Sequence, residues 1–338
     1  MGLNAVIITV TGGTPRVLTV TRPQVAPDTD GGEPLDALPF GPLDPERDRT
    51  LELGLRRWVR EQTGLELGYV EQLYTFGDRD RHPAADARVL SIAYLALVHE
   101  SPPVAGVDAR WQDLYVYVPW EDWREQRPAI IDRQVVPALE AWIGASGDPI
   151  VAGRRRERAA VTFGLSGAPW DRERVLERYE LLYELGLVPE AGRDAGGGQP
   201  IHATSGPEAG RDAGGGQPVH VTSGPDDGSF GRPMVLDHRR IVATALGRLR
   251  GKLRYRPVVF ELLPATFTLL QLQQVVEALS GVRLHKQNFR RLLERSRLVE
   301  GTGRHEILRR GRPAELFRFR REVLRERPAP GVGVPGGH

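Results

Sequence analysis

The chain has 338 residues, no cysteine and a formal net charge of +2. This length favours about two domains, and the lack of cysteine excludes disulfides and Cys-ligated zinc. No apolar run reaches the roughly 20 residues needed to cross a bilayer. The N-terminus also lacks the basic and long apolar regions of a signal peptide. We therefore expect a cytoplasmic protein without a membrane partner.

Charge is distributed unevenly along the chain. Residues 237–327 contain 22 Lys and Arg against 9 Asp and Glu, a net charge of +13, which leaves −11 for the rest. A basic third on an acidic body favours a polyanionic partner for that third. The alternative is a basic surface that only faces solvent.

Residues 1–143 have the pattern of a mixed α/β unit. Alternating apolar residues predict strands at 5–10, 16–22, 70–77, 88–98 and 113–119. A helix is predicted over 49–63, ended by Gly64, and a second over 132–143.

Residues 144–236 form a separate segment by composition. One amphipathic helix is predicted over 169–190, and Asp171 can cap it. Two 18-residue copies follow, at 189–206 and 207–224, which differ at two positions. Their glycine runs do not lie between a strand and a helix, so they do not predict a phosphate-binding loop. We interpret them as a duplication within a linker.

Residues 237–327 predict three helices followed by a β-hairpin. The helices span about 237–253, 268–281 and 285–296, and "TLLQ" from Thr268 offers a capping box for the second. The hairpin runs from "RLVEGT" to "ELFRF" around a basic loop. This order is typical of a winged helix-turn-helix domain. Residues 328–338 are predicted to be a disordered tail.

The stretch "LGLRRWVREQTGL" at 53–65 resembles the Nudix signature R-E-U-x-E-E-x-G-U, in which U is aliphatic. The matching positions are Arg57, Val59, Glu61, Gly64 and Leu65. Trp58 and Gln62 stand where the signature has acids, and Arg49 falls at the position of its upstream glutamate. Positions 58, 61 and 62 share one helix face.

Magnesium prefers several carboxylate oxygens, and only Glu61 remains of the three clustered acids. We therefore expect a degenerate metal site and no required cofactor. Glu61 is expected either to be a relic of that site or to make a local ion pair with Arg57, and the alternative is that it still holds a weakly bound cation. The alternative is an active pyrophosphatase for ADP-ribose or nucleotide sugars that carries a nucleic-acid-binding module.

Longer motifs extend the resemblance. "VEQLYTFGD", "RVLSIAYLALV", "LHKQNFRRLLERSRLVE" and "RRGRPAELFRF" together resemble the Nudix-related transcriptional regulators of NAD metabolism, the NrtR family. The resemblance implies an α+β protein with an N-terminal Nudix-like α/β/α sandwich and a C-terminal winged helix-turn-helix. The boundaries are 1–143 for the ligand-sensing domain, 144–236 for an insertion and 237–327 for the DNA-binding domain.

The same resemblance implies a homodimeric repressor of NAD metabolism genes. Its partners are operator double-stranded DNA and a nucleotide effector, ADP-ribose or a related NAD metabolite. A rival hypothesis is a DNA-binding protein whose Nudix domain binds no ligand and serves only dimerisation.

Site residues follow in two groups. The candidate ligand-binding residues are Tyr74, Phe76, Asp78, Arg81 and Arg57, with aromatic rings for stacking and Arg81 for the diphosphate. The candidate DNA-binding residues are Thr268, Gln271, His285, Lys286, Gln287, Asn288, Arg290, Arg291, Arg309, Arg310 and Arg312. Gln287 and Asn288 can read adenine, and arginine can read guanine or grip phosphate. We expect Phe289, with Leu292 or Leu293, to face the core.

Overall fold

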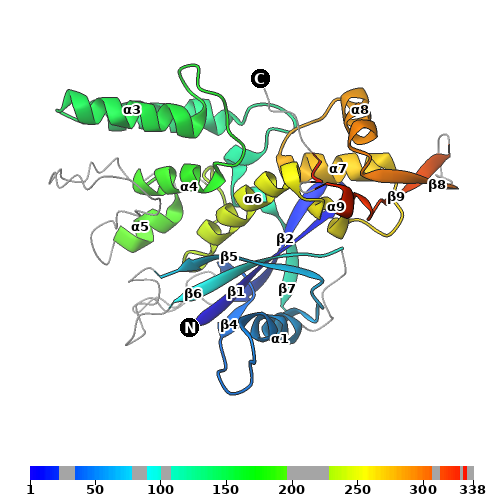
Figure 1. The fold of residues 1–338 in the computed structure, drawn as a ribbon. Helices are drawn as coiled ribbons and strands as arrows, with labels where there is room; N and C mark the ends of the chain where they lie inside the picture. Colours follow the sequence, from blue (N-terminus) through cyan, green and yellow to red (C-terminus); the bar gives the residue numbers. More distant parts are fainter. Residues whose placement is uncertain are drawn as a thin grey trace.

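The computed structural model describes residues 1–22, 35–77, 90–99, 108–195, 228–306, 313–327 and 330–332; side chains 193–195 are outside the description. A seven-stranded sheet, a set of helices above it and a projecting hairpin make up the molecule (Figure 1). The architecture is α+β, as predicted.

The sheet is built from the N-terminal strands. Its order is β3-β2-β1-β6-β5, with β4 on β1 and β7 on β2, and only β1 and β6 are parallel. The strands are β1 (Gly2–Thr11), β2 (Thr14–Arg22), β3 (Leu35–Ala37), β4 (Phe40–Pro42), β5 (Tyr69–Phe76), β6 (Ser91–Leu97) and β7 (Ala109–Asp113). The predicted strands at 5–10, 16–22, 70–77 and 88–98 lie on β1, β2, β5 and β6.

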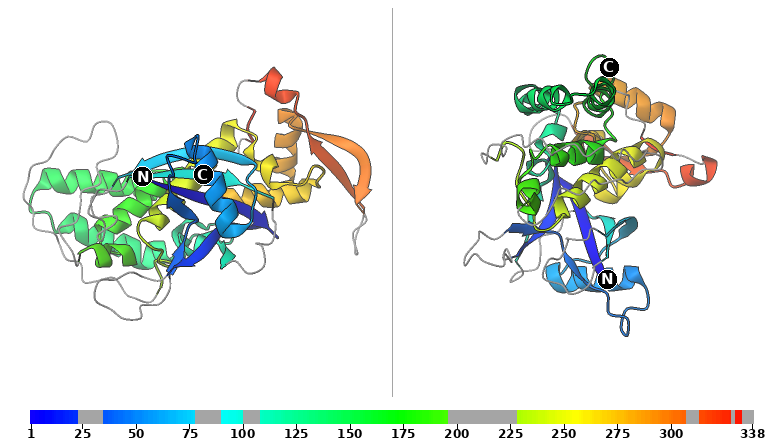
Figure 2. Two further views of the ribbon diagram at one scale, coloured as in Figure 1. Left: turned by 90° about the horizontal axis from the view of Figure 1, so that it is seen from below. Right: turned by 90° about the vertical axis from the view of Figure 1, so that its left-hand side faces the viewer.

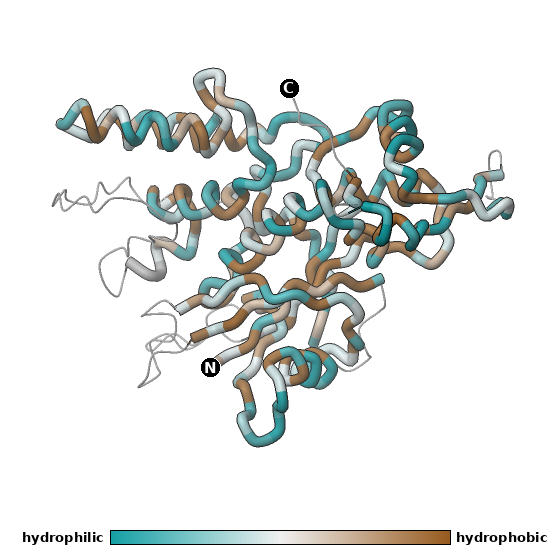
Figure 3. The backbone as a smooth tube through the Cα atoms, viewed as in Figure 1, coloured by the Kyte–Doolittle hydropathy of each residue, from teal (hydrophilic) through white to brown (hydrophobic). Residues whose placement is uncertain are grey.

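Helices cover both faces of this sheet. Alternate residues of a strand point to opposite faces. Leu3, Ala5 and Ile7 of β1 pack in one cluster with Leu55 and Val59 of α1 (Leu51–Thr63). On the other face, Val6 and Ile8 belong to a larger cluster that includes buried residues of α6 (His238–Tyr255). Figure 3 shows hydrophobic residues concentrated along these strands.

Helix α6 is therefore shared between the sheet and the C-terminal unit. It was predicted as the first helix of the DNA-binding domain, yet it contacts β1, β5 and η4 (Val258–Leu262) alike, and α4 (Val175–Glu184) and α7 (Leu269–Ser280) as well. No break in packing marks residue 237, because the larger cluster runs on from the sheet to α7.

The C-terminal unit has the predicted helices and wing. α7 and α8 (Lys286–Ser296) are followed by a hairpin of β8 (Val299–Glu306) and β9 (Ala314–Phe319) and by α9 (Val323–Glu326). The hairpin projects from the body in two views (Figures 1 and 2). Phe267, just before α7, bridges to Phe317 of β9 and so joins the wing to the helices.

The middle segment holds more helix than was predicted. α3 (Pro149–Phe163) was not predicted; Asp148 caps it and Gly164 ends it at φ 60°. The helix predicted over 169–190 was too long, because regular helix is confined to α4 and the short α5 (Pro189–Ala195). Asp171 caps a turn before α4, accepting from the Glu173 amide.

Three smaller predictions need correction. The strand predicted at 113–119 is instead η1 (Leu114–Val116) and η2 (Pro119–Glu121), while the strand precedes it as β7. The helix predicted over 132–143 starts as a π-helical turn, η3 (Ile131–Val135), and continues as α2 (Val136–Gly144). Within the tail, Val332 is fully buried rather than disordered. In the part of the chain that is described, no helix is long and apolar enough to span a membrane.

Candidate ligand site and nucleic-acid interface

Helix α1, which carries the Nudix-like box, is defined by its ends. The Thr50 side chain accepts from the Leu53 amide, and Gly64 closes the helix in the left-handed conformation at φ 71°. Leu55, Val59 and Thr63 are buried, so residues 58, 61 and 62 lie away from the deepest part of the core.

Two of the altered box positions bind the backbone of β4. Trp58 Nε1 donates to the Pro42 carbonyl at 2.6 Å. Gln62 makes two bonds to Phe40: its Nε2 donates to the carbonyl at 2.6 Å, and its Oε1 accepts from the amide at 3.3 Å. A β-carbon on Gly41 would lie 2.2 Å from the Trp58 ring, so this strand approaches the helix too closely for any side chain.

Two acids of this region, Asp48 and Glu61, are bound to Arg57. Its guanidinium donates to both oxygens of the buried Asp48 at 3.0 and 2.8 Å and lies 3.4 Å from Glu61. The hydrogen bond from Arg57 holds the pKa of the Asp48 carboxyl below its usual value. The ion pair predicted between Glu61 and Arg57 is thus present.

These residues do not fit a catalytic magnesium ion. Such an ion needs several oxygens in near-octahedral array, but the amide of Gln62 and the indole of Trp58 are committed to β4. Across the described ranges, no group of three or more His, Asp or Glu side chains is arranged to hold a metal.

The candidate aromatic residues lie at the same end of the sheet as the box. Sheet register aligns Phe76 with Ser91, Gly2 and Pro42, and Tyr74 with Ala93, Asn4 and Phe40. Phe40 and Pro42 are the residues to which Gln62 and Trp58 bind. Two rows of paired residues therefore run across the sheet from the predicted ligand residues to β4, the strand that the box helix binds.

Phe76 and Tyr74 differ in exposure. Phe76 is 8% exposed and belongs to the larger core cluster, whereas Tyr74 is 51% exposed. Their rings meet edge to face at 5.6 Å, and a bulge between Gln72 and Tyr74 shifts the register of β5. Tyr74 thus presents an aromatic ring to solvent, on the sheet face opposite the one that α1 covers. Asp78 and Arg81 lie outside the described residues.

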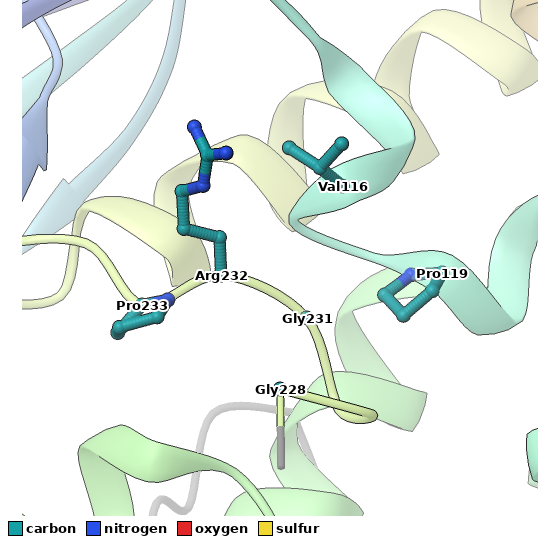
Figure 4. A pocket seen from close by; sticks show the side chains of 6 residues that line it. All are labelled: Val116, Pro119, Gly228, Gly231, Arg232 and Pro233. Atoms are coloured by element: carbon teal, nitrogen blue, oxygen red, sulfur yellow. The ribbon is translucent and has the colours of Figure 1, made fainter. Parts of the chain in front are cut away.

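A shallow pocket among the described residues lies elsewhere. It is lined by Val116, Pro119, Gly228, Gly231, Arg232 and Pro233 (Figure 4). The Arg232 guanidinium at its edge lies 3.3 Å from Asp36. None of these lining residues is a predicted ligand or DNA residue.

Helix α8 has the exposure expected of a recognition helix. His285, Lys286, Gln287, Asn288, Arg290 and Arg291 are all exposed. Phe289 and Leu293 are buried at 2% each, as predicted, and fix the opposite face to the core. The N-terminal end of α8 is therefore free of packing constraints and available for base edges.

Helix α7 begins with the predicted capping box. Thr268 accepts from the Gln271 amide at 3.2 Å, and Gln271 Oε1 accepts from the Thr268 amide at 2.7 Å. Both polar groups thus serve the helix end, and Thr268 is only 7% exposed. A phosphate contact from either residue stays a prediction.

Two features of this unit escaped the sequence-based prediction. The buried Glu277 carboxylate accepts from the Leu284 amide, Gln273 and Arg283, so it shapes the turn between α7 and α8. In the sequence, this role could have been predicted from the position of Glu277 on the otherwise apolar, buried side of α7. Arg304 and His305 on β8 are exposed. Arg309, Arg310 and Arg312 lie outside the described residues.

The fold defines a class: a Nudix-like sheet domain joined to a winged helix. Comparisons with known proteins support this assignment. The crystal structure of Shewanella oneidensis NrtR complexed with a 27mer DNA matches with a TM-score of 0.52 and 20% identity, covering 96% of this chain and 94% of that one. The structure of S. oneidensis NrtR alone matches with a TM-score of 0.51 and 20% identity, over 95% and 94% of the two chains.

Two sequence comparisons add to this structural likeness. Residues 259–319 match the family model described as the NrtR DNA-binding winged helix domain. A curated Acinetobacter baylyi protein, the "ADPR responsive transcriptional repressor NtrR", is 38% identical over 86 residues, 25% of this chain. Those residues span 34% of the relative's length, about a third. The resemblance to NrtR-type regulators and the predicted combination of Nudix-like and winged-helix domains are thus confirmed.

Proposed function

We propose that the protein is a DNA-binding transcriptional repressor that senses ADP-ribose, or a related NAD metabolite, through a degenerate Nudix domain. The observation that carries this proposal is the exposed N-terminal end of α8 within a winged helix that matches the NrtR model. The name of the A. baylyi relative, an ADPR-responsive repressor, supports the effector. We further propose that the protein is cytoplasmic and that its targets are NAD metabolism genes. We propose that it acts as a homodimer that reads palindromic half-sites.

On the DNA side, we propose direct base reading by the exposed Gln287 and Asn288, with Lys286, Arg290 and Arg291 on phosphates or guanine. His285 and the wing arginines Arg309, Arg310 and Arg312 complete the proposed contact surface. On the ligand side, we propose that Tyr74 stacks on a base or ribose, with Phe76 behind it. Asp78, Arg81 and Arg57 remain proposed ligand contacts.

Binding without hydrolysis suits such a sensor. Effector binding changes DNA affinity only to the extent that the effector binds two conformations differently. In this proposal Trp58 and Gln62 brace β4 where an enzyme would hold metal, so the bound nucleotide persists. The rival pyrophosphatase requires the exposed Glu61, paired with Arg57, to act without the other two acids.

The test captures fragments of the source genome on purified protein, with and without ADP-ribose. We expect a few palindromes near NAD genes to be enriched and ADP-ribose to change their enrichment. Replacing Gln287 and Asn288 with Ala should abolish the enrichment. Arg156→Ala, an exposed cation of α3 at the other end of the molecule from α8 (Figure 1), should not.

The rivals predict different results. Magnesium-dependent turnover of ADP-ribose that is lost in Glu61→Gln would support the enzyme. Enrichment that ADP-ribose leaves unchanged, without saturable binding of ADP-ribose, would support the ligand-blind regulator. No selective enrichment in either condition would refute the repressor.

A further inference from the structure

One buried carboxylate lies between two buried guanidinium groups where three segments of the chain meet. Glu121 of η2 is 1% exposed, and its oxygens accept from Arg178 of α4 and Arg250 of α6. Arg178 is 0% and Arg250 4% exposed. The sheet domain, the middle segment and the shared helix α6 each supply one member.

Both guanidinium groups also donate hydrogen bonds beyond those to the Glu121 carboxylate. Arg178 also donates to the carbonyls of Thr162 and Asp171, and its guanidinium lies 4.0 Å from the centre of the Trp170 ring. Arg250 also donates to the Glu121 carbonyl at 3.0 Å and to the Arg172 carbonyl at 3.1 Å. Burial alone would raise the pKa of Glu121, but the two arginines outweigh it and hold that pKa below its usual value.

The remaining bonds of Arg250 reach the end of α7. Its Nε donates to the Leu279 carbonyl at 3.2 Å, and its Nη2 donates to the Tyr115 hydroxyl at 3.3 Å. Tyr115 in turn donates to the Ala278 carbonyl at 2.7 Å. The last carbonyls of a helix lack partners within it and favour a nearby cation. Arg250 supplies both the donor and the charge.

The contact between Arg250 and the end of α7 lies just before α8, the proposed recognition helix. Gly281, the residue that caps α7, accepts from the Trp123 amide at 2.8 Å. A β-carbon on Gly281 would lie 2.5 Å from the Glu121 carbonyl and 2.6 Å from Arg250, so no larger residue fits. Five residues later α8 begins at Lys286. This contact therefore ties the end of α7, which leads into α8, to η2 of the sheet domain.

Helix α6 also contacts the strand that carries the proposed ligand residues. Lys252, two residues after Arg250, lies 2.6 Å from Glu71 of β5, and Tyr69 donates to the same carboxylate. Tyr74 and Phe76 follow on β5. The strand that carries the proposed ligand residues is thus in direct contact with α6, the helix that holds the end of α7.

We infer that Arg250 is a positioning residue that couples the ligand strand to the recognition helix, by holding the C-terminal turn of α7 against Glu121. This inference rests on the proposed function, because coupling requires both a nucleotide effector and DNA. It goes beyond the proposed function by naming Arg250 as the residue through which ADP-ribose binding changes the affinity for operator DNA.

The central variant is Arg250→Lys. It keeps the charge beside Glu121, but one ammonium cannot also reach Leu279 and Tyr115 in the fork geometry of a guanidinium. The matched control is Arg239→Lys. Arg239 is an equally buried arginine of α6, paired with Glu190 at 3.0 Å and donating to Tyr117 and Phe230.

The experiment measures the Kd of full-length protein for its captured genomic fragment, with and without saturating ADP-ribose, and the Kd for ADP-ribose alone. Allosteric coupling typically changes affinity by about 5- to 150-fold. We expect Arg250→Lys to bring this ratio close to one while it changes ADP-ribose affinity by less than about threefold. Arg239→Lys should keep the wild-type ratio. If Arg250→Lys fails to fold, Tyr115→Phe removes the bond to Ala278 and the bond from Arg250 Nη2, leaves the other bonds of Arg250 in place, and should lower the ratio partly.

Two results would overturn the inference: a wild-type ratio in Arg250→Lys, or an equal loss in both arginine variants. If the wild type shows no response to ADP-ribose, the proposed function has failed instead. Hydrogen exchange then tests the contact on its own. Amides of 281–285 and α8 should exchange faster in Arg250→Lys than in Arg239→Lys, and equal rates would refute the role of Arg250.

Discussion

At the scale of single residues, polar side chains of the Nudix-like box make hydrogen bonds and ion pairs within the protein. Trp58 and Gln62 replace acids with groups that can donate hydrogen bonds to carbonyls, and both do so on β4. Arg57 pairs with Asp48 and Glu61. Trp58 and Gln62 thus stabilise the contact between helix α1 and strand β4.

Gly41→Ala should destabilise the protein. The added methyl would overlap the Trp58 ring, and overpacking typically costs about 1–3 kcal/mol. Urea unfolding followed by circular dichroism measures the loss. In a Trp58→Ala background the ring is gone, so the same Gly41→Ala change should cost little; an equal cost in both backgrounds would contradict the close approach.

Asp48→Asn should change how stability depends on pH. Arg57 lowers the folded-state pKa of Asp48 below its ordinary 3.8, so its contribution is fully present above about pH 4 and is lost as pH falls through the folded value. We expect the free energies of unfolding of wild type and Asp48→Asn to differ at pH 7 and to converge below pH 3.8. Glu46→Gln, a change at an exposed neighbour, is the control. A difference that stays constant down to pH 2 would contradict this account.

At the scale of elements, helix ends and turns were predictable because they depend on local chemistry. The Thr268 cap, the stop at Gly64 and the buried side of α8 follow from residue type and spacing alone. The strand predicted at 113–119 failed for a tertiary reason. Tyr115 and Tyr117 alternate as in a strand, but both are buried, with their hydroxyls bonded to Ala278 and Asp36.

The capping box of α7 makes a prediction at this scale. Thr268→Ala leaves the Gln271 amide without its acceptor, and loss of such a cap typically costs about 1 kcal/mol. Thermal unfolding should show a lower Tm for Thr268→Ala and a wild-type Tm for Thr266→Ala, two residues earlier. If the two variants melt together, the cap contributes no stability.

At the scale of the whole molecule, part of the uneven charge of the sequence forms ion pairs inside the protein. Five basic side chains of α6 pair with acids from the chain before residue 191: Lys252 with Glu71, Arg250 with Glu121, Arg254 with Glu173, Arg240 with Glu180 and Arg239 with Glu190. The basic third therefore binds the acidic body as well as offering cations on α8. Sequence alone could not divide these roles, because burial of Arg239 and Arg250 depends on tertiary contacts.

Because α6 covers one face of the sheet, residues 1–145 should not form a stable unit alone. That fragment would expose the apolar face that includes Val6, Ile8 and Leu95. Burial of such a face is the main stabilising contribution in a small domain. We expect the fragment to aggregate or to bind the dye ANS strongly, and the full chain not to do so. A monomeric, cooperatively folding fragment would show that α6 is dispensable to the sheet.

The pair between Arg239 and Glu190 bears on how the duplicated segment can evolve. Glu190 lies in the first copy of the repeat, and the second copy repeats its "PEAGRDA" without change. Arg239 offers a single carboxylate site, with its other donors bound to Tyr117 and Phe230. Within the described residues, this contact is made by Glu190 of the first copy, and it ties that copy to α6. A substitution of Glu190 would leave the buried Arg239 without its carboxylate, so selection is expected to retain an acid at this position.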